Sequence, residues 1–273
     1  PLSLAGGKEY AVTFAFGLTP FRPTAKTEKP LRFRAGSYST FDLLWPSPEV
    51  QPYFGYPLAP ANSAIIPDWL NKHQKTRNYV YQIPFFAMTN LPQYNYFAKE
   101  WQEYPERIYP PNSLKYPDAL VNVDVRQSSW QDLFLSDYFK YLRDNQFNGV
   151  YFDCVNIYSN READGRFNYQ VFAVRDFLQR IYIVQRQAKP QSWSIAHCGS
   201  AVTDFCNTFA EIALTGEHYR AECQQYRYYL EFLTLEEFRV QNCGKIGAWR
   251  MFLPQFRGPK TEAVDVAVHT MGM

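Results

Sequence analysis

Residues 147–160, FNGVYFDCVNIYSN, are the stretch on which the interpretation of the whole chain depends. Its run GVYF, residues 149–152, is short and apolar, as in a buried strand, and the acid Asp153 follows directly. A polar segment that includes Asn156 comes next. An acid in this position usually starts a turn or caps a helix. The alternative is that Asp153 faces a pocket and takes part in chemistry, and the surrounding fold decides between the two.

Strand patterns and helix patterns alternate along the second half of the chain. Ser128 and Ser129 precede apolar residues at helical spacing, which predicts an amphipathic helix. Thr234 and Glu237 occupy the positions of a helix capping box. The predicted helices are 130–145, 169–187 and 234–242, and the predicted strands are 149–155, 193–199, 211–217 and 246–256.

The first half of the chain is less regular. Residues 10–18 predict a buried strand, and residues 20–62, rich in proline and aromatic residues, predict long loops. Residues 79–88 predict another strand, in which Pro84 fits only at a bulge. A long polar and aromatic loop is expected over 89–124.

The alternation of buried strands with helices predicts an α/β protein with a parallel sheet and crossover helices. About seven strand patterns in one chain favour a (β/α)8 TIM-like barrel, formed as a single domain over residues 1–273. The last strand of such a barrel is missing, so we expect a barrel incomplete at the C-terminus, excised from a longer chain. A doubly wound open sheet is the alternative, but no GxGxxG or GxxxxGK[ST] motif supports its nucleotide-binding versions.

Composition excludes several classes of function. The net charge of +2 gives no basic field for nucleic acid, and no apolar run of about 18 residues predicts a membrane span. Five cysteines without a CxxC pair, and only four histidines, argue against a metal site, and we expect no cofactor. The odd cysteine count leaves homo-oligomers open. The aromatic content of 18% fills a core and also suits the flat faces of sugars.

Polar residues lie where the predicted strands end. In a barrel these ends form the active site, so residues from separate strands meet there. Each residue taken alone has a structural explanation, as a turn, a cap or a backbone partner. The strand ends carry Asp153, His197, Glu217 with His218, Gln255 and Asn90.

Two acids from separate strands are what glycoside hydrolysis requires. We predict Asp153 as the nucleophile or charge stabiliser and Glu217 as the general acid/base. His197 and Gln255 would orient sugar hydroxyls, and the weaker candidates are Asp124 and Tyr151, the latter expected to point into the core. The other predicted substrate-binding residues are Asn90, Asn156, His218 and Trp249.

Three segments resemble bacterial proteins related to glycoside hydrolase family 123: AVTFAFGLTPFRP, FNGVYFDCVN and FAEIALTGEHY. The matching elements are Thr19-Pro20, Asp153 and Gly216-Glu217. The resemblance implies a TIM-barrel glycosidase and a secreted or periplasmic location, although PLSLAGGKEY at the start is not a signal peptide. Cys154 follows Asp153 where that family has an Asp-Glu pair, which argues against its substrate-assisted cleavage of N-acetylhexosaminides. YFDC also resembles the fourth strand of α-galactosidase-type barrels, where such an Asp is the nucleophile.

The favoured hypothesis is therefore a glycoside hydrolase that acts on a poly- or oligosaccharide. The alternative is a non-catalytic carbohydrate-binding or structural protein on a glycosidase-like barrel, in which one acid is turned away or paired with arginine. A third hypothesis, a metal-dependent hydrolase that uses His197 and His218, has little support because histidines are few.

Overall fold

The structure is a computed structural model of the whole chain. It describes residues 41–44, 77–89, 91–103, 108–109, 119–144, 147–156, 159–161, 165–198, 209–226, 231–234, 236–237 and 248–252.

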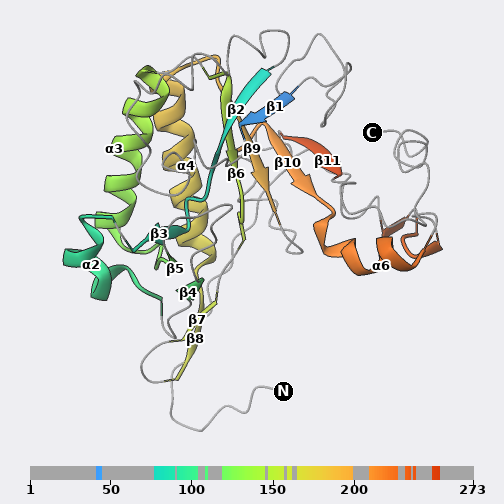
Figure 1. The fold of residues 1–273 in the computed structure, drawn as a ribbon, viewed down its shortest axis with the longest axis horizontal. Helices are drawn as coiled ribbons and strands as arrows, with labels where there is room; N and C mark the ends of the chain where they lie inside the picture. Colours follow the sequence, from blue (N-terminus) through green and yellow to red (C-terminus); the bar gives the residue numbers. More distant parts are fainter. Residues whose placement is uncertain are drawn as a thin grey trace, which may run out of the picture.

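The main feature is a six-stranded sheet in which all strands are parallel (Figure 1). Strand order in the sheet equals strand order in the chain, so the order never reverses. Doubly wound open sheets do reverse their strand order, and the reversal point is where they bind ligands. The order seen here is that of a singly wound wall, as in a (β/α) barrel. The strands are β1 (Phe41–Leu44), β2 (Arg77–Gln82), β6 (Gly149–Phe152), β9 (Trp193–His197), β10 (Ile212–Thr215) and β11 (Trp249–Phe252).

The three central strands are buried along their whole length. Every residue of β6, β9 and β10 is buried, on both faces of the sheet. This explains why their sequences are mostly apolar and do not alternate regularly with polar residues, as expected for a parallel sheet in an α/β protein. The predicted parallel α/β sheet is thus confirmed, and its closure into a full barrel stays a prediction.

Two long helices cover one face of the sheet (Figure 1). They are α3 (Ser128–Asp144) and α4 (Val171–Ala188), which confirms the helices predicted over 130–145 and 169–187. Phe134 of α3 packs edge-on against Phe177 of α4, with ring centroids 5.5 Å apart. Tyr138 of α3 contacts Phe152 of β6 at 5.7 Å, so the side of β6 that carries Phe152 faces the helices.

The segment between β2 and α3 differs from the prediction. The expected single strand over 79–88 is two strands, because a turn at Pro84 and Phe85 ends β2 and starts β3 in another sheet. Proline cannot donate to a ladder, and its carbonyl instead accepts a bond from Trp130 Nε1 at 3.1 Å. The loop expected over 89–124 contains α2 (Tyr94–Trp101) and an antiparallel sheet of β3 (Phe86–Met88), β5 (Leu120–Asn122) and β4 (Ile108–Tyr109).

Several smaller elements complete the described fold. The capping box is confirmed: Glu237 N donates to Thr234 Oγ1 at 3.1 Å, and the backbone N–H and hydroxyl of Thr234 lower the pKa of Glu237. The sequence did not predict the hairpin of β7 (Ser159–Arg161) and β8 (Phe167–Tyr169), or η2 (Glu217–Tyr219) and α6 (Arg220–Gln225).

The strand expected over 10–18 and the loops over 20–62 lie outside the described residues, apart from β1. No described helix is long and apolar enough to span a membrane.

Gly149 is needed where β6 begins. A Cβ on this residue would lie 1.9 Å from the carbonyl oxygen of Trp193 and 2.7 Å from the ring of Tyr79. We therefore expect Gly149→Ala to lower the free energy of unfolding by about 1–3 kcal/mol, because neither a backbone nor a buried ring can move away cheaply. Urea unfolding measures the change, and Ser136→Ala on the exposed side of α3 is the control. Equal stability of the two variants would contradict the packing described here.

Candidate active site

Asp153 stands at the carboxyl end of β6, where two neighbouring strands hold the backbone. Its N–H donates to the carbonyl of Gln82 at the end of β2, at 2.9 Å. Two residues later, Val155 N–H donates to the carbonyl of His197 at the end of β9, also at 2.9 Å. Because Phe152 pairs with Ala196 in the parallel register, Asp153 and His197 lie at the same level. The backbone ladder therefore brings the acid and the histidine together.

The side chains of Asp153, His197 and Tyr151 meet in one hydrogen-bonded cluster. His197 Nδ1 lies 2.7 Å from Asp153 Oδ1 and 2.7 Å from Tyr151 Oη. The same Oδ1 accepts the backbone N–H of Cys154 at 2.8 Å. Tyr151 and Asp153 are two residues apart, so they point to the face of the sheet opposite Phe152 and away from α3.

The cluster is buried, but the acid is accessible. Tyr151 is 3% exposed and His197 5%, whereas the side chain of Asp153 is 22% exposed. An ionised carboxylate can only accept hydrogen bonds, so the Cys154 N–H favours its charged form, and His197 does the same in the tautomer that carries hydrogen on Nδ1. The arrangement can therefore present a fixed, ionised carboxylate to a molecule bound at the carboxyl end of the sheet.

The residue after the acid has an unusual backbone conformation. Cys154 has a φ of 57°, and within the described residues it alone, apart from glycines, has a positive φ. Its carbonyl accepts the N–H of Asn156 at 2.8 Å, which closes a tight turn. Non-glycine residues in the left-handed region cost free energy and occur often at functional sites. The unusual conformation thus directly follows Asp153, while Val155 still donates to the end of β9.

The second predicted acid lies on the same edge of the sheet. Strand β10 ends at Thr215, Gly216 turns the chain with a φ of 107°, and Glu217 begins η2. Leu214 pairs with His197, so Glu217 follows three residues beyond the level of Asp153. Strand β9 separates the two strands that carry these acids. The structure describes the backbone of Glu217 and not its side chain.

The remaining predicted ligands are more scattered. His218 is exposed in η2, with its ring 4.0 Å from that of Tyr219, and Asn156 is half-buried in the turn after Asp153. Trp249 is the first residue of β11, level with Ile195 of β9 and two levels before His197, and its role in binding stays a prediction. Asn90 and Gln255 lie outside the described residues.

Two other buried acids have structural partners. Asp124, a weaker candidate, accepts bonds from the Arg126 guanidinium at 2.8 and 2.6 Å beside the start of α3. Glu211, which the sequence did not single out, is fully buried before β10 and pairs with Arg186 of α4. Its Oε2 also accepts the N–H of Ser194 at 2.7 Å. The Glu211 contacts join β9 to α4, those of Asp124 are local to the segment before α3, and neither acid belongs to the cluster around Asp153.

The sequence analysis did not predict the part that Tyr151 takes in the cluster. We expected it to point into the core, and it is buried, but its hydroxyl contacts His197 in the cluster. The signal was present, because residues two apart on a strand share a face and Asp153 follows at that spacing. Within the described residues, no group of three or more His, Cys, Asp or Glu could hold a metal ion.

Comparison with known proteins adds distant structural similarity only. No family model matches the sequence, and no curated protein matches it. Similar solved structures include a Paenibacillus sp. cycloisomaltooligosaccharide glucanotransferase, with 10% identity, a TM-score of 0.42, and coverage of 55% of this chain and 24% of that one. Another is the glycoside hydrolase domain of PelA from Pseudomonas aeruginosa, with 12% identity, a TM-score of 0.38, and coverage of 64% and 65%. A third is the maltogenic α-amylase AmyB from Thermotoga neapolitana, with 9% identity, a TM-score of 0.42, and coverage of 66% and 38%.

The chain spans only part of the length of these proteins, about a quarter in the first case. The neighbours are glycoside hydrolases and a glucanotransferase. None of the three is described as a member of glycoside hydrolase family 123, and that resemblance stays a prediction. What the structure defines is the class: an α/β protein with a singly wound parallel sheet and an acid–histidine–tyrosine cluster at its carboxyl end.

Substitution should separate the structural acid from the candidate catalytic acid. Glu211→Gln removes the negative charge that faces Arg186 in a buried setting, so we expect the free energy of unfolding to fall by about 2–4 kcal/mol. Asp153→Asn should change it by less than about 1 kcal/mol, because the acid is partly exposed to solvent. Urea unfolding of both variants measures the difference. A larger loss for Asp153→Asn would assign that acid a structural role.

Proposed function

We propose that the protein is a glycoside hydrolase in which Asp153 is the acid that faces the anomeric carbon. The observation that carries the proposal is the contact of Asp153 Oδ1 with the Cys154 backbone N–H, which donates to it, and with His197 Nδ1, at the carboxyl end of a central parallel strand. Glycosidase chemistry needs a carboxylate that stays ionised while an oxocarbenium-like centre forms beside it. Hydrogen bonds to the charged form favour that state.

Glu217 is the proposed partner acid. It follows β10 at the same end of the sheet, and β9 lies between its strand and that of Asp153. In the proposed reaction Glu217 gives a proton to the leaving glycosidic oxygen and Asp153 attacks or stabilises the anomeric carbon. A separation of the carboxyl groups of about 5–5.5 Å would give retention of configuration, and one of about 6.5–9.5 Å inversion.

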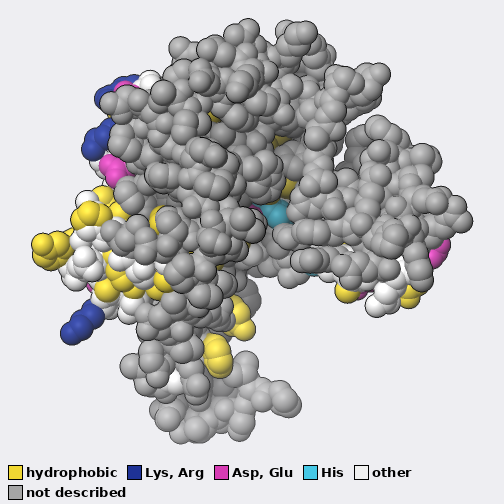
Figure 2. All heavy atoms as spheres, viewed as in Figure 1, with side chains coloured by type: hydrophobic (Ala, Val, Ile, Leu, Met, Phe, Trp, Pro, Cys, Tyr) yellow, Lys and Arg dark blue, Asp and Glu magenta, His cyan; other side chains and the backbone are white. Residues whose placement is uncertain are grey.

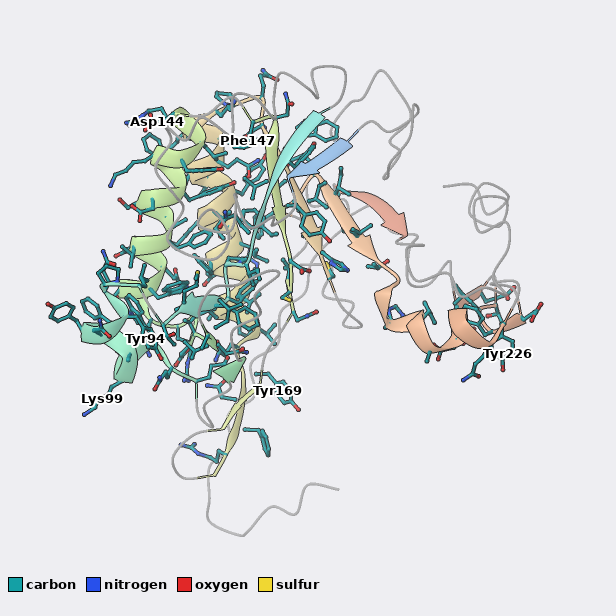
Figure 3. All side chains as sticks on the ribbon, viewed as in Figure 1. Tyr94, Lys99, Asp144, Phe147, Tyr169 and Tyr226 are labelled. Atoms are coloured by element: carbon teal, nitrogen blue, oxygen red, sulfur yellow. The ribbon has the colours of Figure 1, made fainter. Side chains whose placement is uncertain are left out.

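An aromatic hairpin supports a glycan as the substrate. Hairpin β7–β8 lies in the connection that follows Asp153 and precedes α4, and it carries the rings of Phe167, 67% exposed, and Tyr169, 65% exposed. Figure 3 labels Tyr169 on this hairpin, and Figure 2 shows hydrophobic side chains at the surface in the same region of the view. Phe172 at the start of α4 is 44% exposed. Most large aromatic side chains in the described part are buried, and the exposed ones gather at two places: this hairpin with the start of α4, and α2, where Tyr96 and Phe97 are exposed. Flat rings suit the C–H faces of sugars, and this position would serve sugar units beyond the bond that is cleaved.

Activity against a panel of 4-nitrophenyl α- and β-glycosides tests the role of Asp153. We expect Asp153→Asn to lower kcat/KM by more than about 10³-fold on any glycoside that the wild-type protein hydrolyses, since the amide carries no charge. Asp176→Asn, on the exposed side of α4, is the matched control and should leave the rate unchanged. A variant Asp153→Asn that retains wild-type turnover would remove Asp153 from the reaction. Glycan binding without turnover in the wild-type protein would instead favour a carbohydrate-binding protein.

The hairpin is tested with a long substrate and a short one. Replacing Phe167 and Tyr169 together by alanine should raise KM about tenfold for the polysaccharide that the wild-type protein hydrolyses best, since each ring contributes about 0.5–1.5 kcal/mol. The same double variant should leave kcat/KM for the 4-nitrophenyl glycoside unchanged. Tyr96→Ala, which removes another exposed ring on α2, is the control. Equal effects on both substrates would exclude a role in binding distant sugar units.

A further inference from the structure

We propose that Tyr151 is a positioning residue that shares the Nδ1–H of His197 with Asp153 and so sets the basicity of the acid. The catalytic meaning of this inference rests on the proposed function. The proton arrangement itself is a property of three described side chains and can be measured without any substrate. Tyr151 acts through His197, so it would not contact the sugar itself.

The geometry carries the inference because one ring nitrogen has two close oxygen neighbours. His197 Nδ1 lies 2.7 Å from Asp153 Oδ1 and 2.7 Å from Tyr151 Oη. A neutral or charged imidazole offers at most one hydrogen at Nδ1. If Nδ1 lacked this hydrogen, its lone pair would face the lone pairs of an ionised carboxylate at 2.7 Å, which is repulsive. With Asp153 ionised, Nδ1 therefore holds the hydrogen and donates it.

The phenol oxygen then accepts part of the same hydrogen bond. Because Nδ1–H cannot be directed fully at two oxygens, the share taken by Tyr151 weakens the bond to Asp153. A weaker donor leaves the carboxylate more basic and a better nucleophile. Removing the hydroxyl should therefore strengthen the His197–Asp153 bond and lower the pKa of Asp153, while removing the Nδ1 donor should raise it.

Burial makes this sharing stable. Tyr151 and His197 are almost fully buried and come from adjacent strands, with Tyr151 level with Ile195 and Asp153 level with His197. Neither ring can turn away without disturbing the sheet, and hydrogen bonds are stronger in such surroundings. The other titratable or charged residues on or directly after the described parts of β2, β6, β9 and β10 are Arg77, Tyr79, Tyr81, Cys154, Cys198, Glu217 and His218.

The experiment is NMR on protein labelled with ¹⁵N-histidine and ¹³C-aspartate. The ¹⁵N shifts of His197 report which ring nitrogen carries hydrogen, and the carboxyl ¹³C shift of Asp153 gives its pKa. The variants are Tyr151→Phe, His197→Asn and His197→Gln. The side-chain nitrogen of Asn lies about where Nδ1 lies, whereas that of Gln lies near Nε2, so Asn keeps the donor and Gln does not. Tyr138→Phe, which removes a buried hydroxyl bonded to Gln185 and distant in sequence from the cluster, is the control.

We expect His197 in the wild-type protein to be protonated at Nδ1 at neutral pH. The pKa of Asp153 should fall in Tyr151→Phe, rise by about one unit or more in His197→Gln, and stay near the wild-type value in His197→Asn and Tyr138→Phe. An unprotonated Nδ1 in the wild-type protein would overturn the proposal, and this observation needs no variant to fold. A pKa of Asp153 that is the same in Tyr151→Phe and wild type would also overturn it. These results stand apart from the glycoside assays, so each proposal can fail alone.

Discussion

The parallel hydrogen-bond ladder across β2, β6 and β9 is the constraint on which the rest of the structure depends. It continues one step past the end of β6, through Asp153 N–H to Gln82 and Val155 N–H to His197. The acid therefore has the positional precision of a strand although it no longer belongs to one. A turn or loop residue free of the ladder would not keep Oδ1 at 2.7 Å from a ring on the neighbouring strand. Precise placement on a rigid element is what a reacting carboxylate requires.

An acid lies at each end of the sheet, and the two acids have different partners. Before β10, Glu211 is fully buried against Arg186 and the N–H of Ser194, where it joins sheet and helix. After β6, Asp153 is partly exposed and contacts His197, an imidazole that need not carry a charge. A carboxylate neutralised by arginine is held by a full opposite charge, whereas one held by N–H dipoles keeps most of its charge available. The division agrees with the general rule that the carboxyl ends of parallel strands carry function and the amino ends carry stability.

Sequence patterns predicted the elements whose periodicity is long or whose apolar run is unbroken. Helices α3 and α4 and strands β6, β9 and β10 belong to this group, and burial on both faces of the strands explains their clear signal. The segment over 89–124 has the sequence pattern of a loop because its strands β4 and β5 have only two and three residues, too few to show alternation. Pro84 was noticed as a poor fit in a strand, yet pattern alone does not say that the chain changes sheet there.

The sequence predicts only those parts of the candidate site that can be recognised from a local pattern, such as the end of a strand. Asp153 and His197 were found because each ends a recognisable strand, and strand ends meet at one edge. The level of Trp249 in the sheet depends on register: β11 starts at that residue, which places its backbone two levels before His197. The contact of Tyr151 with His197 was not predicted, because a buried aromatic residue in an apolar run cannot be told from a core residue until the partner of its hydroxyl is known. Register and hydrogen-bond partners come from contacts between strands, and no local pattern encodes them. The cluster of Tyr151, Asp153 and His197 therefore appears only when β6 and β9 are paired.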